Sequence, residues 1–481
     1  MSVSGTVTLS DNARLRPKEL QEADIFNIVT PTFGVNKNGA RLKVNARYSP
    51  SLLWYMAGTG ESTVRNTLYS DANLQVIENF FYVDARANIF QTFLSPFGPQ
   101  PGDIGSSTAN RTEATTLSLA PYIRGRLPGG SQYTIRDEIT YTTFSTGQRP
   151  DSYGNAFTTR WDGVGGTFIV PSFDYNYYSV EYGSQPAFIS QLARLRATAN
   201  VDTDFQLIAT GGYESNDFVF SEQKGPIYGG GFNWKPSPRT EVKANIERRF
   251  FGNSFDIDAT YRTAFTGWTL RAGRRIQTSQ QQIQQFTSSS NSGLRTSLDA
   301  LFAQAIPDPV QRELFVNQLL AQSGFSSLLG SPTPIFTPRV LLTESIEPAI
   351  AIIGNRTTVT LSMYWRKTTP LTEAVAASSV DPFNNFGTIT QRGGGVIVSH
   401  KLDPMLTGTM SLNRLFVEGA ATAAGTPAFE SVQTIFNMGL SRQISPKTYG
   451  TVGLRWQVFN SNNFPDYRER AVLVSLSHTF F

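Results

Sequence analysis

Long segments of this chain alternate between apolar and polar residues. In TEVKANIERRF (residues 240–250), the apolar positions Val242, Ala244 and Ile246 alternate with polar residues, most of them charged. A period of two puts different side chains on the two faces of a β-strand. Many of these segments reach the roughly 9 to 11 residues that a tilted strand needs to cross a bilayer. The pattern recurs at 41–48, 81–90, 131–142, 193–201, 255–262, 268–276, 359–366 and 452–458.

The links between these segments also alternate in length. Short turns such as NKNG (37–40), LPGG (127–130) and KPSPRT (235–240) contrast with longer polar links at 56–63, 95–113, 146–154, 217–226, 279–336, 368–386, 418–428 and 460–467. A soluble sandwich shows neither this asymmetry nor a charged face on nearly every strand. We therefore predict an all-β, antiparallel transmembrane β-barrel of about 18 to 22 strands, formed by residues 1–481 as a single domain.

Composition excludes several other classes. The mean hydropathy is −0.22, and no apolar run approaches the roughly 18 residues of a transmembrane helix. The absence of cysteine excludes disulfides, Cys-ligated zinc and iron–sulfur clusters. A net charge of +4 does not indicate a nucleic-acid partner. We expect no cofactor and no metal, and we expect location in the bacterial outer membrane after removal of a signal peptide.

The C-terminus, AVLVSLSHTFF, fits a closing strand. Its even positions are apolar or aromatic, and Phe480 keeps that phase while Phe481 follows it. A final strand that ends in phenylalanine resembles the signal read by the bacterial barrel-assembly machinery, so Phe480 and Phe481 are the candidate assembly signal. If this end is periplasmic, the short turns are periplasmic and the long links extracellular, and lipopolysaccharide surrounds the outer half of the barrel.

The polar face of the strands predicts a basic lumen. The inward acids are Asp84, Glu138, Glu241, Glu247, Asp256 and Asp258. The inward basic residues are more numerous: Arg41, Lys43, Arg47, Arg86, Arg136, Arg194, Arg196, Lys243, Arg249, Arg262, Arg271, Arg275, Arg366 and Arg455. Such a pore would concentrate anions. The alternative is that opposite charges on neighbouring strands pair and hold the wall in shape.

Residues 279–336 depart from the barrel pattern. A polar run at 280–292 precedes apolar residues at helical spacing, and Asp308 with the following proline resembles a helix start. We predict two short helices in a long loop that is either extracellular or inserted in the lumen as a gate or plug. The gate candidates are Leu298, Phe302, Asp308, Leu314, Phe315 and Leu319.

Catalysis is not expected. The chain has two histidines, and both His400 and His478 are in phase with apolar residues near a strand end that we expect to be periplasmic, so we place them on the lipid face. The inward carboxylates Asp256 and Asp258 are flanked by arginines on adjacent strands. They are better explained as neutralised wall charges than as the carboxylate pair of a glycoside hydrolase.

The run WKPSPRTEVKANIERRFFGNSFDIDATYRTAFTGWTLRAGRRIQ (234–277) resembles the central signature of the outer-membrane barrels associated with exosortase (PEP-CTERM) loci. NARLRP near the N-terminus and the C-terminal strands are similar to the ends of that family, whereas ERRFFG replaces the usual GHRFFG. The resemblance implies an outer-membrane porin that exports an exopolysaccharide with a periplasmic polysaccharide-export partner. The alternatives are a general diffusion or uptake porin for anionic solutes and a structural or adhesive barrel.

Overall fold

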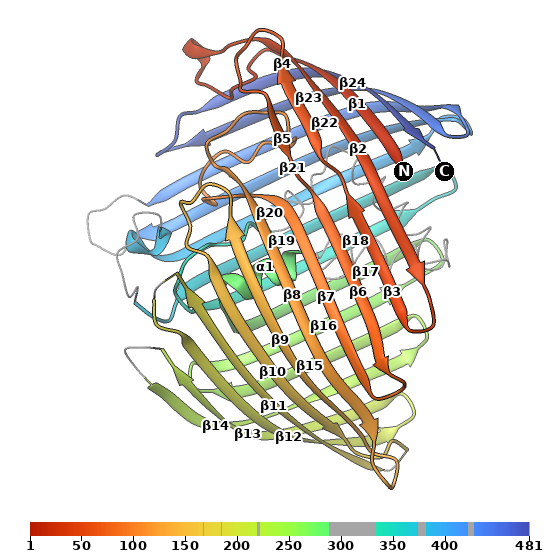
Figure 1. Cartoon of the computed structure of the whole chain (residues 1–481), viewed down its shortest axis with the longest axis vertical. Helices are drawn as coiled ribbons and strands as arrows, with labels where there is room; N and C mark the ends of the chain where they lie inside the picture. The colour runs from red at the N-terminus through yellow and green to blue at the C-terminus, as the bar shows by residue number, and fades with distance from the viewer. Residues whose placement is uncertain are drawn as a thin grey trace.

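The chain folds into a closed antiparallel β-barrel (Figure 1). The computed structural model describes residues 1–166, 168–183, 185–218, 222–287, 332–373, 381–421 and 428–480. The first strand pairs with the last, Val7 opposite Val474, and this pairing closes the sheet. No helix among these residues is long and apolar enough to cross a membrane.

The strands are β1 (Ser2–Ser10), β2 (Asp24–Asn38), β3 (Leu42–Tyr48), β4 (Ser51–Tyr55), β5 (Thr63–Arg65), β6 (Leu68–Ile77), β7 (Phe81–Phe93), β8 (Arg111–Arg126), β9 (Gln132–Phe144), β10 (Ser152–Asp162), β11 (Ile169–Tyr182), β12 (Phe188–Asp202), β13 (Phe205–Asp217), β14 (Glu222–Ser237), β15 (Thr240–Arg249), β16 (Gly252–Arg262), β17 (Thr266–Gln277), β18 (Leu341–Ile353), β19 (Thr357–Pro370), β20 (Phe386–Lys401), β21 (Leu406–Ala421), β22 (Phe429–Ser445), β23 (Thr448–Ser461) and β24 (Tyr467–Thr479). The described helices are α1 (Ser279–Thr287) and the 3-10 turns η1 (Lys18–Leu20) and η2 (Pro382–Asn384).

These segments form a wall of 22 strands, because two wall strands are each interrupted once. β3 and β4 both pair with β2, and their other neighbours are β6 and β5 respectively. β3 with β4 is therefore one wall strand, and β5 with β6 is the next. This number lies within the predicted range.

The two faces of the wall carry the side chains that the alternation predicts. On β23 the outward residues Leu454 and Trp456 are 54% and 42% exposed, whereas the inward residues Arg455 and Gln457 are almost fully buried. Outward aromatic side chains lie towards both strand ends, for example Trp268 on β17. An apolar outer belt flanked by aromatic residues is the surface that a bilayer requires.

Short turns and long links lie at opposite ends of the barrel, which we call the short-turn end and the long-loop end. The pairing of β1 with β24 places both described chain ends at the short-turn end. Two details differ from the prediction. The link predicted at 217–226 is shorter, because β14 begins at Glu222. The connection of β15 to β16 at the long-loop end is a tight turn, since Arg249 pairs directly with Gly252.

Candidate functional site

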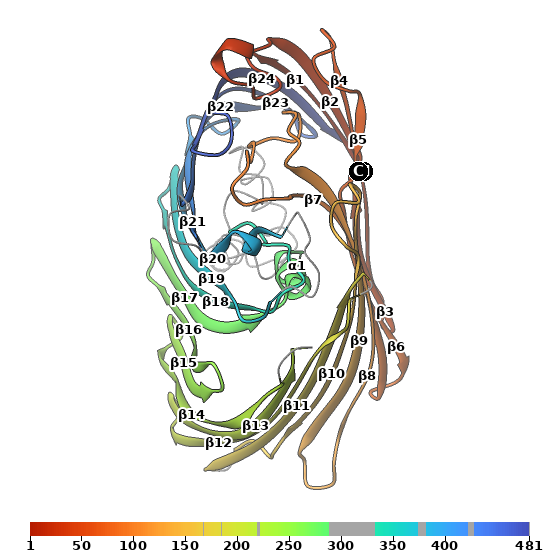
Figure 2. The ribbon, with the colours of Figure 1, turned by 90° about the vertical axis from the view of Figure 1, so that its left-hand side faces the viewer.

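Several segments fold inwards from the long-loop end and lie within the barrel (Figure 2), and two of them carry most of the contacts described below. The first insert is residues 94–110, between β7 and β8. The second insert is residues 278–340, between β17 and β18, of which 278–287 and 332–340 are described. The barrel is elongated in cross-section, and α1 lies inside it. The lumen and these inserts form the candidate site.

A buried ion cluster anchors the first insert to the wall at β23 and β24. Asp103 of the insert forms an ion pair with Arg455 of β23. Arg455 also donates to both carboxylate oxygens of Glu469 on β24, at 2.9 and 2.7 Å. Ser10 and Gln457 donate to the same carboxylate at 2.8 and 2.6 Å. The side chains of Arg455 and Glu469 are 2% and 0% exposed. Separating the insert from the wall would leave a buried charge without its partner, which is strongly unfavourable. We call this cluster of Asp103, Arg455 and Glu469 the latch, because it holds the first insert to the wall.

Two wall glutamines hold the backbones of the two inserts in the same way. Gln433 of β22 accepts from the backbone N–H of Gln100 at 2.9 Å and donates to its carbonyl at 2.7 Å. Gln391 of β20 accepts from the N–H of Thr333 at 2.9 Å and donates to its carbonyl at 3.0 Å. The inserts bond directly to each other, because the Thr333 hydroxyl donates to Gln100 Oε1 at 2.7 Å. All four residues are buried, so their backbone groups need these partners.

The second insert begins with α1, where we predicted a polar link. Ile283 is buried on one side of this helix, and the Gln284 amide donates to the Thr140 hydroxyl of β9 at 2.8 Å. The Gln280 amide donates to the Thr140 carbonyl at 3.1 Å. The glutamines of this segment bond to the wall and to the insert, and these bonds favour a helix here. The spacing of apolar residues does not reveal such partners, so the sequence predicted a polar link.

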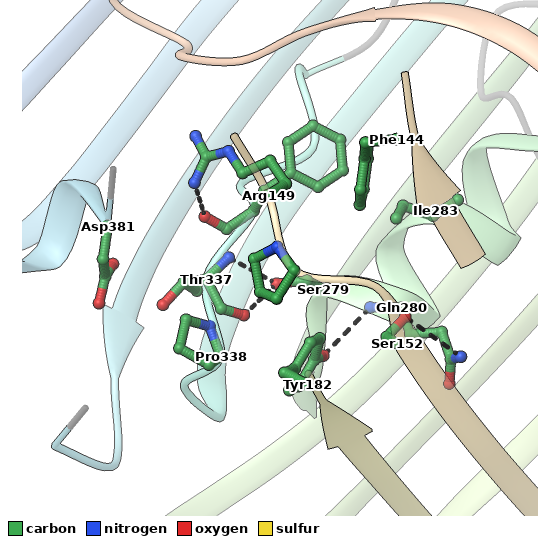
Figure 3. A pocket seen from close by; sticks show the side chains of 12 residues that line it. Phe144, Arg149, Ser152, Tyr182, Ser279, Gln280, Ile283, Thr337, Pro338 and Asp381 are labelled. Atoms are coloured by element: carbon green, nitrogen blue, oxygen red, sulfur yellow. Dashed lines mark hydrogen bonds between the residues drawn. The ribbon is translucent and has the colours of Figure 1, made fainter. Parts of the chain in front are cut away.

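Figure 3 shows where the second insert meets the wall. Ser279 donates to the carbonyls of Ile335 and Thr337, at 3.0 and 2.6 Å, and so ties the two described ends of the insert together. The space enclosed by this joint is about 20 Å³, roughly the room that one water needs. It is a packing joint rather than a ligand site.

Arg149 joins both inserts from the link between β9 and β10. Its guanidinium donates to the carbonyl of Phe336 at 2.7 Å and also to the carbonyl of Leu94. Burial lowers the pKa of Arg149 to about 10, which leaves the side chain charged at neutral pH. Further along, Phe97 of the first insert and Ile335 of the second share one hydrophobic cluster with Phe386 of β20.

Beneath α1 the lumen contains a polar chamber of about 300 Å³. Arg86 of β7 and Arg275 of β17 line it, and these two strands lie on facing sides of the barrel (Figure 2). Their nearest carboxylates are 3.9 Å away on Glu138 and 3.7 Å away on Asp256, distances longer than those of hydrogen bonds. The rest of the lining is mainly glutamine: Gln277, Gln281, Gln284 and Gln285. Guanidinium groups bind carboxylates in a forked geometry, and amides bind hydroxyls. The chamber suits a hydroxylated anion.

The strand registers place the predicted basic residues on the lumen face, with Arg41 in the turn before β3. Ten of the fourteen form ion pairs, namely Arg86, Arg136, Arg194, Arg196, Lys243, Arg249, Arg271, Arg275, Arg366 and Arg455. Several of their partners were missing from the predicted set of acids: Asp174, Glu214, Glu347, Glu469 and Asp103. Pairing across the wall therefore accounts for much of the basic face. Lys43 and Arg47 have no carboxylate partner among the residues that the structure describes.

The remaining predicted residues are placed as follows. Phe480 lies beside His478, with ring centroids 4.9 Å apart, and its N–H donates to the Met1 carbonyl at 3.0 Å. His400 and His478 lie at the short-turn end, where each contacts a threonine hydroxyl of the neighbouring strand. The described part of the chain contains no group of three His, Asp or Glu side chains that could hold a metal ion. Phe481 and the gate candidates Leu298, Phe302, Asp308, Leu314, Phe315 and Leu319 lie outside the described residues.

Gly154 of β10 is the wall position that admits α1. A Cβ atom there would lie 1.9 Å from Gln280 Oε1. Gly154→Leu is expected to displace the helix and to lower the free energy of unfolding by about 1–3 kcal/mol, measured by urea titration in lipid vesicles. Gly225→Leu on β14 is the matched control, since a Cβ there meets nothing within 4 Å. Equal losses in the two variants would contradict the assigned role of Gly154.

The latch predicts a dependence on pH. Burial disfavours a charged Asp103, but the charge of Arg455 and hydrogen bonds from Ser106 outweigh it and hold the pKa of Asp103 below its usual value of 3.8. A carboxyl with a depressed pKa stabilises the latched state above its usual pKa, and this stabilisation disappears as the pH falls through the lower value. We expect constant channel conductance at and above pH 5 and a rise only in stronger acid. A transition near pH 6 would exclude Asp103 as its source.

Comparison with known proteins supports the fold. No protein-family model matches the sequence, and no curated protein does so either. The chain is similar to the ferric citrate transporter FecA in its unliganded form, with 9% identity, a TM-score of 0.50, and coverage of 100% of this chain and 78% of that one. It is also similar to the siderophore receptor PiuA from Acinetobacter baumannii, with 6% identity, a TM-score of 0.48, and coverage of 99% of this chain and 81% of that one. A further similar structure is OccK2 (OpdF) from Pseudomonas aeruginosa in complex with glucuronate, with 8% identity, a TM-score of 0.37, and coverage of 100% of this chain and 98% of that one. Identities this low identify an outer-membrane type of β-barrel and leave the exosortase-associated family as a resemblance in sequence.

Proposed function

We propose that the barrel is an outer-membrane channel through which an acidic polysaccharide leaves the cell, together with a periplasmic polysaccharide-export partner. The observation that carries this proposal is the chamber beneath α1. Arg86 and Arg275 face it from two walls, each about half exposed and only loosely paired. A sugar acid has the carboxylate that these arginines bind and the hydroxyls that the neighbouring glutamines bind.

The two inserts support a gated channel rather than an open one. Their described residues are held to the wall by hydrogen bonds and one ion cluster. Such contacts form and break reversibly, and a partner at the short-turn end could bias them. Export in particular is implied by the resemblance to exosortase-associated barrels.

The test is conductance of the purified barrel in a planar bilayer, with reversal potential measured under a salt gradient. Trigalacturonate and maltotriose are then compared as blockers, because they are similar in length and differ in charge. We expect anion selectivity and block by trigalacturonate, both weakened in Arg86→Gln/Arg275→Gln. Arg442→Gln, which alters an outward residue of β22, is the control. Equal block by both sugars would exclude recognition of acids.

The competing functions are separated by deletion of the gene in the native host. Loss of secreted polysaccharide supports export. Intact secretion with reduced uptake of anionic solutes supports a diffusion porin. A barrel that stays silent in the bilayer even without its second insert supports a structural or adhesive role.

A further inference from the structure

A group of basic residues lies on the outside of the barrel, where the lumen does not use them. We call Lys367 (β19), Arg392 (β20), Arg414 (β21), Arg468 and Arg470 (β24) the basic wall patch. All five are exposed and outward. Four lie towards the long-loop ends of their strands, and Arg414 lies near the middle of β21. Arg468 and Arg470 flank the buried Glu469, so the alternation of β24 directs both away from the lumen.

The strand registers place these residues beside the edge of the apolar belt that is nearer the long-loop end. Arg392 pairs with Trp365 on one side and Phe416 on the other, and Arg470 pairs with Trp456. The Arg414 guanidinium lies over the Phe416 ring, 4.7 Å from its centroid. Aromatic rings of this kind mark the level of lipid headgroups. The basic wall patch is therefore at headgroup depth.

The charges of the patch are largely unsatisfied. Arg392 pairs with Glu418 at 2.8 Å, on a surface where both side chains are about half exposed. Lys367, Arg414, Arg468 and Arg470 have no carboxylate within salt-bridge distance among the described residues. Because these positive charges border an apolar surface, an anion with acyl chains can neutralise them and contact that surface at the same time.

The opposite side of the barrel lacks such a patch. No outward position of β9 to β13 holds a basic residue, and the long-loop ends of these strands present Glu181 and Asp217 instead. A general need for charge at the bilayer interface would place basic residues around the whole circumference. Outward basic residues also lie near the long-loop end on β14, β15 and β17, but Lys224 and Arg274 form ion pairs with Glu222 and Glu344, and Arg248 donates to Asn253. The basic wall patch differs because four of its five charges lack a carboxylate partner among the described residues, and this difference indicates a site.

We propose that the basic wall patch binds the phosphate groups of an anionic membrane lipid. Guanidinium groups match phosphate in a forked geometry. Arg414 and Arg468 are three strands apart, a separation of about 14 Å at the usual strand spacing. This span accommodates two phosphates, on one bisphosphorylated glycolipid or on two neighbouring phospholipids. The proposal is independent of what passes through the lumen.

The test uses the full barrel in detergent, with native mass spectrometry as the readout of bound lipid. The probes are bisphosphorylated lipid A, phosphatidylglycerol and phosphatidylcholine. A surface arginine near anionic lipid contributes about fivefold in affinity. The triple variant Arg414→Gln/Arg468→Gln/Arg470→Gln should therefore bind the phosphate lipids about a hundredfold more weakly.

The control is again Arg442→Gln, outward on β22 but at the short-turn end. Far-UV circular dichroism verifies that both variants fold. Preference of the wild-type barrel for lipid A over phosphatidylglycerol identifies the glycolipid, and equal binding of the two identifies phosphate alone as the determinant. Undiminished binding in the triple variant, or equal binding of phosphatidylcholine by the wild-type barrel, would overturn the proposal.

Discussion

Arg455→Ala is expected to lower the free energy of unfolding by about 3–5 kcal/mol, because removing one member of a buried ion cluster leaves the remaining charges buried without a partner. The Glu469 side chain is fully buried, and Arg455 supplies two of its four hydrogen bonds. Asp103 loses its ion-pair partner at the same time. The first insert should therefore detach from the wall, and the channel should conduct more. Urea titration in vesicles and bilayer recordings measure the two effects.

The control for this variant is Arg271→Ala. Arg271 also pairs with a carboxylate, on Asp258 at 3.3 Å, but the two side chains are 32% and 44% exposed. Ion pairs in contact with water contribute no more than about 1 kcal/mol. The variant Glu469→Gln/Arg455→Met removes both wall charges and should lose less stability than Arg455→Ala. Equal behaviour of Arg455→Ala and Arg271→Ala would mean that the cluster is not a latch.

The strands of the wall could be predicted from alternation because the facing of each residue depends only on its neighbours in the sequence. A residue's place in the period of two decides whether it faces lipid or lumen, and Arg455 on β23 is inward as predicted. The closing strand also follows from pattern, since the same period extends to His478 and Phe480. The shortened 217–226 link shows the limit: strand ends are set by pairing with β13 rather than by composition.

The site could not be predicted in the same way. Asp103 meets a partner that is 352 positions away in the sequence, and it lies in a Pro- and Gly-rich stretch that resembles an ordinary surface loop. Nothing in the pattern around Gln433 or Gln391 distinguishes a glutamine that clamps a backbone from one that faces water. The acid Asp174 lies on β11, in a region whose alternation is weak, so its pairing with Arg196 was missed. Contacts across the lumen form only when the barrel is closed, so the local periodicity of the sequence does not predict them.

Removing the second insert should widen the lumen where α1 now lies. Gln277 and Leu341 pair across β17 and β18, so a short Asn-Gly turn can replace residues 279–339 without separating the strands. The wall keeps its register while the glutamines of α1, which line the chamber, are lost. We expect a steady conductance well above that of the intact barrel. Block by trigalacturonate should weaken, because Arg86 and Arg275 remain without the amides that bind hydroxyls.

Replacing the first insert in the same manner provides the contrast. Phe93 and Arg111 pair at the ends of β7 and β8, so a turn can also replace residues 95–109. This variant should conduct more than the intact barrel yet keep its block by trigalacturonate, since the chamber has no residue from the first insert. If deletion of residues 95–109 opened the channel and deletion of residues 279–339 did not, the first insert would be the barrier and the second insert would serve binding alone. If each deletion opened it in part and the double deletion opened it fully, the two inserts would be gates over separate halves of one lumen.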